Sequence, residues 1–197
     1  MALILPHSVF LHVPKTGGTW CRAAIHNASI PHFESGAKHE SPYYRIHHPL
    51  DRVRTIAGNR FLFAFVRDPL DWWRSFWGHR MRFGWGNHPV DNACRANDFN
   101  EFMANVVDRP PGWCSAMYRQ FVGPRHQPIH FVGRFENLAN DLLEALHLAG
   151  ERFDERAVRS TPPENVNDYS RLAAEYSPSM LEAVRNSERE AIERFDY

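Results

Sequence analysis

Residues 8–20 read SVFLHVPKTGGTW, a β-rich run that stops abruptly at a proline, a lysine and two glycines. Residues 19–29 carry apolar side chains at helical spacing, so a helix is predicted directly after the turn. Such a strand-to-helix turn presents several backbone N–H groups to one point, at the positive end of the helix dipole. It can therefore hold a phosphate-like anion; the alternative is a plain turn with a solvated lysine.

Two further pairs of strand and helix follow this first one. Residues 61–66 (FLFAFV) are apolar without alternation, which indicates a strand covered on both faces of a parallel sheet, and an aromatic helix is predicted over 71–83. Residues 129–132 predict a third strand, and a helix is predicted over 136–149 that stops at Gly150. Strands that alternate with helices favour an α/β fold with a central, mainly parallel sheet flanked by helices.

Residues 78–127 interrupt this alternation and predict a helical insert over the site. Within the insert, Asp98 and Glu101 resemble a capping box at the start of a helix. Near the other end of the chain, Ser177 followed by proline predicts the N-cap of the last helix. The length of 197 residues fits a single domain over residues 1–197.

The composition narrows the class of protein. Basic and acidic side chains balance at 23 each, which argues against a nucleic-acid partner held by a general positive field. Three cysteines without a CxxC spacing predict no disulfide framework and no zinc site, and they favour a reducing cytoplasm. No apolar run approaches the roughly 18 residues of a membrane span, so no membrane insertion is expected. The sequence gives no sign of the oligomeric state.

The order P-K-T-G-G-T differs from the Walker A loop of nucleoside triphosphatases, in which the lysine follows the glycines. It resembles the 5′-phosphosulfate loop of the sulfotransferases that use 3′-phosphoadenosine 5′-phosphosulfate (PAPS). In that family the lysine contacts the phosphosulfate, while loop amides and the threonine hydroxyl hold the 5′-phosphate. The resemblance implies a three-layer fold of the P-loop type and a cofactor-binding loop made of Pro14, Lys15, Thr16, Gly17, Gly18, Thr19 and Trp20.

Residues 65–77 (FVRDPLDWWRSFW) resemble the second signature of the same family, in which an arginine and a serine eight residues later hold the 3′-phosphate. These positions are Arg67 and Ser75 here, and an arginine can grip a phosphate with two donors at once. Residues 132–142 also resemble the strand–helix segment of bacterial and Golgi-type members. A glycine-rich basic loop near the C-terminus is missing, and residues 160–167 are the candidate replacement.

The resemblance implies transfer of a sulfuryl group from PAPS to a hydroxyl or amine of a small-molecule or glycan acceptor, with a carbohydrate preferred and no metal. Lys15 would stabilise the departing bridging oxygen, an effect of about 10²–10³ in rate. A general base must remove the acceptor's proton. In one subfamily a histidine ahead of a Pro-Leu pair is the base. Residues 46–50 read IHHPL, and His47 is the first candidate there, with His48 adjacent. His39 is the second candidate, and Glu40 and His48 rank behind both.

Two alternatives remain open on the sequence: an ATP-dependent small-molecule kinase, in which Asp68 would hold magnesium instead of capping a turn, and a non-catalytic protein that binds a nucleotide on the same fold. The insert also holds residues that suit either an acceptor sugar or ordinary packing and a solvated face, namely Trp85, Trp113, Phe99, Phe102, Arg80, Arg82 and Arg95.

Overall fold

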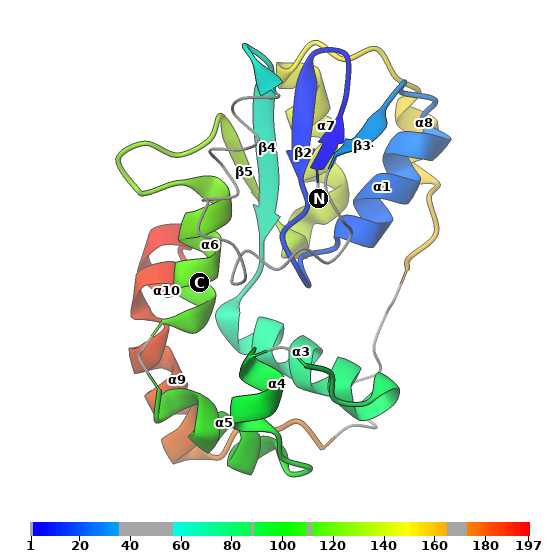
Figure 1. The fold of residues 1–197 in the computed structure, drawn as a ribbon. Coiled ribbons are helices and arrows are strands. Elements are labelled where there is room, and N and C mark those ends of the chain that lie inside the picture. Colours follow the sequence, from blue (N-terminus) through cyan, green and yellow to red (C-terminus); the bar gives the residue numbers. More distant parts are fainter. Residues whose placement is uncertain (1, 36–56, 88, 110–111, 165–172) are drawn as a thin grey trace. The chain divides into compact units, whose positions relative to one another are not determined.

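The computed structural model describes residues 2–35, 57–87, 89–109, 112–164 and 173–197 (Figure 1). These residues fall into two compact units. The first unit comprises Met1–Arg67 with Met117–Asn165, and the second comprises Asp68–Ala116 with Val166–Tyr197. The prediction of one domain over the whole chain stays a prediction.

The first unit is built on a five-stranded sheet in the order β3-β1-β2-β4-β5. Its strands are β1 (Ala2–Ile4), β2 (Ser8–Leu11), β3 (Phe33–Ser35), β4 (Phe61–Val66) and β5 (Phe131–Arg134). The neighbours β2 and β4 are parallel, as are β4 and β5, whereas β1 runs antiparallel to both β2 and β3.

The sheet is therefore mixed, and the prediction of a mainly parallel sheet is wrong. The difference comes from β1, an apolar segment that the sequence analysis did not assign to a strand. Only three residues connect β1 to β2, and the turn is closed by the Leu5 amide, which donates to the Ser8 carbonyl at 2.9 Å. A connection this short can join only antiparallel strands.

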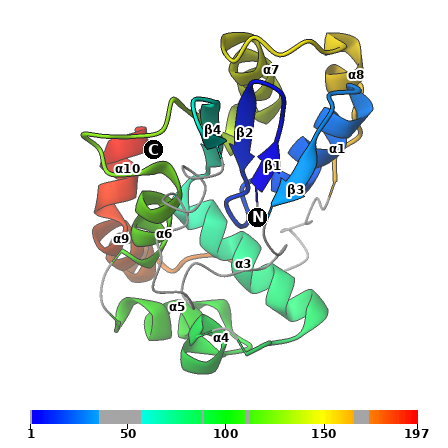
Figure 2. The same cartoon turned by 45° about the horizontal axis from the view of Figure 1, so that its top comes forward.

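Strands β2 and β4 are buried along nearly their whole length, which confirms that the FLFAFV strand is covered on both faces. One face packs against the helices α1 (Gly18–Asn27), α7 (Leu138–Leu148) and α8 (Glu155–Arg159) (Figure 2). Alternate residues of the strands, among them Phe10, Phe63 and Phe65, form this core together with the apolar side chains of those helices. The helix α7 stops where expected, and Gly150 follows it with φ 71°.

The second unit is helical. It contains α3 (Pro69–Phe83), α4 (Pro89–Cys94), α5 (Phe99–Val107), α9 (Pro178–Ser187), α10 (Arg189–Phe195) and the first residues of α6 (Trp113–Val122). The described part of residues 78–127 contains the end of α3 and the helices α4, α5 and α6, and an insert over the site stays a prediction. Three expected caps are present: the side chains of Asp68, Asp98 and Ser177 accept from the backbone N–H groups of Leu70, Glu101 and Met180.

A buried glutamate organises the second unit. Glu188, only 1% exposed, lies between α9 and α10 and accepts hydrogen bonds from the backbone amides of Cys114 at 2.9 Å and Ser115 at 2.8 Å. Its carboxylate also accepts from the Ser115 hydroxyl and from the indole N–H of Trp73. The carboxylate therefore caps the first turn of α6 and ties it to α3. Among the described residues no helix is long and apolar enough to cross a membrane.

Candidate functional site

The loop after β2 folds back on itself before α1 begins. Lys15 and Gly17 both have left-handed backbones, with φ 63° and φ 80°. Between them Thr16 is buried, and its hydroxyl donates to the Val13 carbonyl at 3.0 Å. The loop conformation is thus held by its own hydrogen bond.

Protein packing requires both glycines of the loop. A Cβ atom on Gly17 would lie 3.1 Å from a ring carbon of Phe135 and would overlap Leu138. A Cβ on Gly18 would lie 2.7 Å from Cγ of His12 and closer still to Cδ2 and Nε2 of that ring. The close approach that the two glycines allow is therefore to neighbouring side chains.

The residues of α1 supply no negative charge to offset the positive end of its helix dipole. Its N-cap, Gly17, has no side chain to accept a hydrogen bond, and the first turn contains no acidic residue. The first N–H groups of a helix lack intrahelical acceptors, and the helix dipole adds about half a positive charge at this end. The turn therefore has the polarity that an anion needs.

Arg67 follows β4 directly and lies beside this loop. Its Nη1 atom is 3.5 Å from the Lys15 carbonyl oxygen, and its guanidinium group stacks on the Phe135 ring, 4.1 Å from the centroid. Because β2 and β4 are parallel neighbours, their carboxyl ends meet at one edge of the sheet. The structure thus brings together the Lys15 loop and Arg67, which belong to two separate sequence motifs.

Two aromatic residues that the sequence analysis missed hold Arg67 and the loop in place. The buried hydroxyl of Tyr118 donates to the Arg67 carbonyl at 2.7 Å and accepts from its amide at 3.1 Å. Phe135 contacts both Arg67 and the position of Gly17. No local pattern around either residue signals these roles, because each depends on contacts between segments distant in the sequence.

The segment 132–142, selected for its resemblance, positions Phe135. Asp141 on α7 accepts from the Arg134 amide at 2.6 Å and from the side chain of Asn137 at 2.6 Å. Gly133 is in close contact with the Phe65 ring, which leaves no room for a Cβ. These contacts lock the end of β5 onto α7, and β5 thereby becomes the third parallel strand to deliver residues to the same edge.

Trp20 connects α1 to the segment after α8. Its indole N–H donates to the Thr161 carbonyl at 3.2 Å, and Asn27 donates to the Thr161 hydroxyl at 3.2 Å. Thr161, which belongs to the candidate segment 160–167, is therefore attached to α1 both at its first turn and at its last residue. In the same helix, burial raises the pKa of the Cys21 thiol well above its ordinary value, so this thiol stays neutral.

The roles of the other predicted site residues stay predictions. Thr19 is half-buried in the first turn of α1, and Ser75 is buried on α3 of the second unit, so its pairing with Arg67 stays a prediction. The candidate bases His39, Glu40, His47 and His48 lie outside the residues that the structure describes.

The residues that the sequence offered for an acceptor sugar take different roles in the structure. Phe99 and Phe102 are fully buried, so both take the packing role and neither offers a stacking platform. Arg80 forms an ion pair with the buried carboxylate of Asp91, at 2.7 Å, and its role is structural. Arg95 lies over the half-buried Trp85 ring, 6.0 Å from its centroid.

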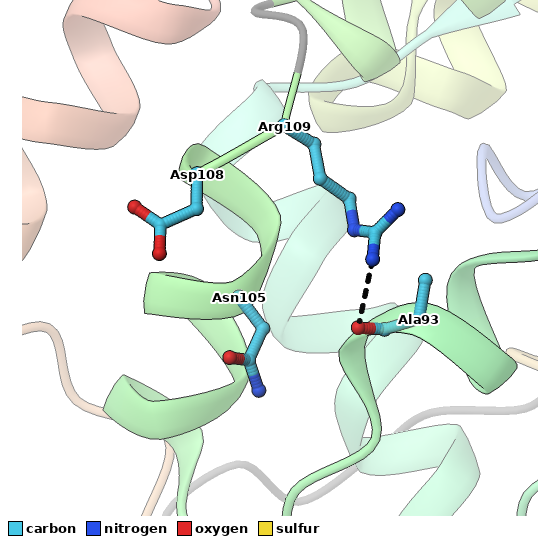
Figure 3. Close-up of a pocket in the computed structure, with 4 residues that line it drawn as sticks. All are labelled: Ala93, Asn105, Asp108 and Arg109. Atoms are coloured by element: carbon cyan, nitrogen blue, oxygen red, sulfur yellow. Dashed lines mark hydrogen bonds between the residues drawn. The ribbon is translucent and has the colours of Figure 1, made fainter.

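A polar cavity of about 450 Å³ in the second unit is lined by Ala93, Asn105, Asp108 and Arg109 (Figure 3). The Arg109 guanidinium donates to the Ala93 carbonyl at 3.3 Å, where it caps the end of α4. Burial raises the pKa of the neighbouring Cys94 thiol, and Arg109 offsets part of that rise. None of the residues selected from the sequence lines this cavity.

No protein-family model, curated protein or solved structure matches this chain. The resemblance to PAPS-dependent sulfotransferases therefore rests on the sequence motifs, and the geometry described above is the independent observation beside them.

Proposed function

We propose that the chain is a PAPS-dependent sulfotransferase that moves a sulfuryl group onto a hydroxyl or amine of an acceptor, with a carbohydrate as the preferred acceptor class. One observation carries the proposal: Arg67 lies 3.5 Å from the carbonyl of Lys15, beside the N-terminus of α1. PAPS has two separate anionic groups, the 5′-phosphosulfate and the 3′-phosphate. A loop lysine and a second cation at one sheet edge suit such a donor, and ligands gather at the carboxyl ends of parallel strands.

In the proposed reaction the acceptor oxygen or nitrogen attacks the sulfur of PAPS while the bond from sulfur to the bridging oxygen breaks. The bridging oxygen leaves on 3′-phosphoadenosine 5′-phosphate (PAP), and the ammonium group of Lys15 stabilises its developing charge. The acceptor's proton passes to His47, or to His39 in its place. Backbone amides of the loop and the Thr19 hydroxyl hold the 5′-phosphate.

The 3′-phosphate belongs to Arg67 together with Ser75 in this proposal. A guanidinium group donates two parallel hydrogen bonds to a phosphate, which a lysine cannot do. This pair is what would separate PAPS from ATP. The three-layer arrangement of the P-loop type is part of the same proposal.

The proposal is tested by thermal unfolding in the presence of ligands. A ligand that binds only the native protein stabilises it by about 2.7 kcal/mol at a hundredfold excess over its dissociation constant. We expect PAP to raise the unfolding temperature in the presence of a metal chelator and ATP with magnesium to have little effect. The opposite pattern would replace the sulfotransferase with a kinase. No stabilisation by either nucleotide would contradict both.

A further inference from the structure

One side chain satisfies both backbone polar groups of Arg67. The pairing of β4 with β5 ends one residue earlier, where Val66 lies opposite Arg134. At the next residue, the Tyr118 hydroxyl donates to the Arg67 carbonyl at 2.7 Å and accepts from the Arg67 amide at 3.1 Å. A hydroxyl can donate and accept at once, so Tyr118 does for Arg67 what a neighbouring strand does for the residues before it.

Burial makes this contact difficult to replace. Tyr118 is fully buried, and Arg67 is only 6% exposed, so little water reaches either residue. Buried backbone N–H and C=O groups are almost always paired, because an unpaired one pays its full desolvation penalty. The Arg67 backbone is therefore held at the hydroxyl, and the Cα atom from which its side chain projects has a fixed position.

The far end of the Arg67 side chain is held separately. Its guanidinium group lies on the Phe135 ring, 4.1 Å from the centroid, and its Nη1 atom lies 3.5 Å from the Lys15 carbonyl oxygen. A guanidinium group binds a phosphate through two parallel hydrogen bonds only if its plane and position fit the phosphate oxygens. Supporting contacts must hold such a group within about 0.5 Å of its productive position.

We propose that Tyr118 is a positioning residue that sets the preference for a nucleotide with a 3′-phosphate. The inference rests on the proposed function, in which Arg67 binds that phosphate. The Tyr118 hydroxyl is bonded to the Arg67 backbone, so it acts on the ligand through Arg67. Loss of the hydroxyl should therefore weaken binding of PAP and leave binding of adenosine 5′-phosphate, which has no 3′-phosphate, unchanged.

The test measures the affinities of PAP and adenosine 5′-phosphate for the wild type, Tyr118→Phe and Ser8→Ala by titration calorimetry. Tyr118→Phe removes only the hydroxyl. Ser8→Ala is the matched control, because the buried Ser8 hydroxyl donates to Glu151 at 2.7 Å at the start of β2, in the same unit.

We expect Tyr118→Phe to lower the ratio of PAP affinity to adenosine 5′-phosphate affinity by about tenfold, the lower end of what one charge-assisted contact contributes. Ser8→Ala should leave this ratio as it is in the wild type. If Tyr118 had a structural role alone, both variants would lose stability and keep the ratio, and this outcome would overturn the inference.

Hydrogen exchange in the wild type gives a second test, which decides if Tyr118→Phe does not fold. If the hydroxyl contact strengthens binding of the 3′-phosphate, that binding strengthens the contact by the same factor. We expect the Arg67 amide to exchange more slowly with saturating PAP than with saturating adenosine 5′-phosphate. The Leu62 amide, which donates to the His130 imidazole near the start of β4, should exchange equally in both complexes. Equal exchange of the Arg67 amide would refute the inference.

The outcomes separate the inference from the proposed function. If the wild type binds PAP no more tightly than adenosine 5′-phosphate, the proposed function fails and the inference with it. If the wild type prefers PAP and Tyr118→Phe keeps the full preference, the inference alone fails.

Discussion

Substituting Gly18 by alanine should destabilise the wild-type protein, and the same substitution should be harmless once His12 is shortened. Gly18 is the first residue of α1, and its backbone φ is not in the left-handed region. Alanine therefore fits the backbone conformation at this position. The obstacle is the imidazole, since the new Cβ would lie 2.7 Å from its Cγ and closer to two other ring atoms.

The expected magnitude follows from two opposed effects. Overpacking a filled site costs about 1–3 kcal/mol, and here the clash is with a ring that is itself packed on Phe10. Alanine in place of glycine in a helix gains about 0.5–1 kcal/mol. We expect Gly18→Ala to lower the free energy of unfolding by about 1–2 kcal/mol in the wild type and to raise it by about 0.5 kcal/mol in His12→Ala, a coupling of about 2 kcal/mol.

Urea denaturation of the four proteins of this double-mutant cycle measures the coupling. Gly150→Ala serves as a matched control, because Gly150 has φ 71° and no neighbour within 4 Å of an added Cβ. Its backbone cost, about 1–2 kcal/mol, should be the same with and without His12. Additive effects of Gly18→Ala and His12→Ala would refute the contact between the imidazole and the helix start.

Three further substitutions test the site and the second unit. Arg67→Ala should weaken PAP binding by about ten- to a hundredfold, the worth of one charge-assisted contact, and leave binding of adenosine 5′-phosphate nearly unchanged. Calorimetry on both ligands measures this, with the exposed Arg125→Ala as the control, and equal losses for the two ligands would show that Arg67 does not bind the 3′-phosphate. His47→Ala should abolish sulfuryl transfer while PAP affinity stays as in the wild type, and a fully active variant would move the base to another residue. Glu188→Ala should lower the free energy of unfolding by about 3–5 kcal/mol, because buried N–H donors lose their acceptor. The control Glu193→Ala, at an exposed position, should change it by less than about 0.5 kcal/mol, and similar denaturation curves for both variants would disprove the capping role.

The elements that the sequence predicted well have causes that lie within a few residues. The turn from β2 into α1 follows from an apolar run, two glycines and a helical pattern in direct succession. The caps at Asp98 and Ser177 are likewise local, because each side chain accepts from an amide three residues ahead. Hydrogen bonds of this kind depend only on neighbouring residues, so they can be predicted from a short stretch of sequence.

The sheet and the packing of the site depend on distant partners, and here prediction fell short. β1 pairs with β2 and β3 on its two sides. It contains only three residues, which is too short for a periodic pattern that could predict a strand. Tyr118 and Phe135 each meet Arg67 only after β4, α6 and β5 have come together. Lys15 and Arg67 were selected because the residues around them resemble two sulfotransferase motifs, and their roles in binding and catalysis stay predictions.

The contact of Phe135 with the Gly17 loop also sets a time at which the site can exist during synthesis. The loop leaves the ribosome early, but the ring that packs against it belongs to a segment beyond residue 130. At about 5–20 residues per second, the ribosome needs on the order of ten seconds to add that segment. A nascent chain therefore carries the PKTGGT loop long before it carries Phe135, and the packed form of the loop should appear only after β5 and α7 have emerged.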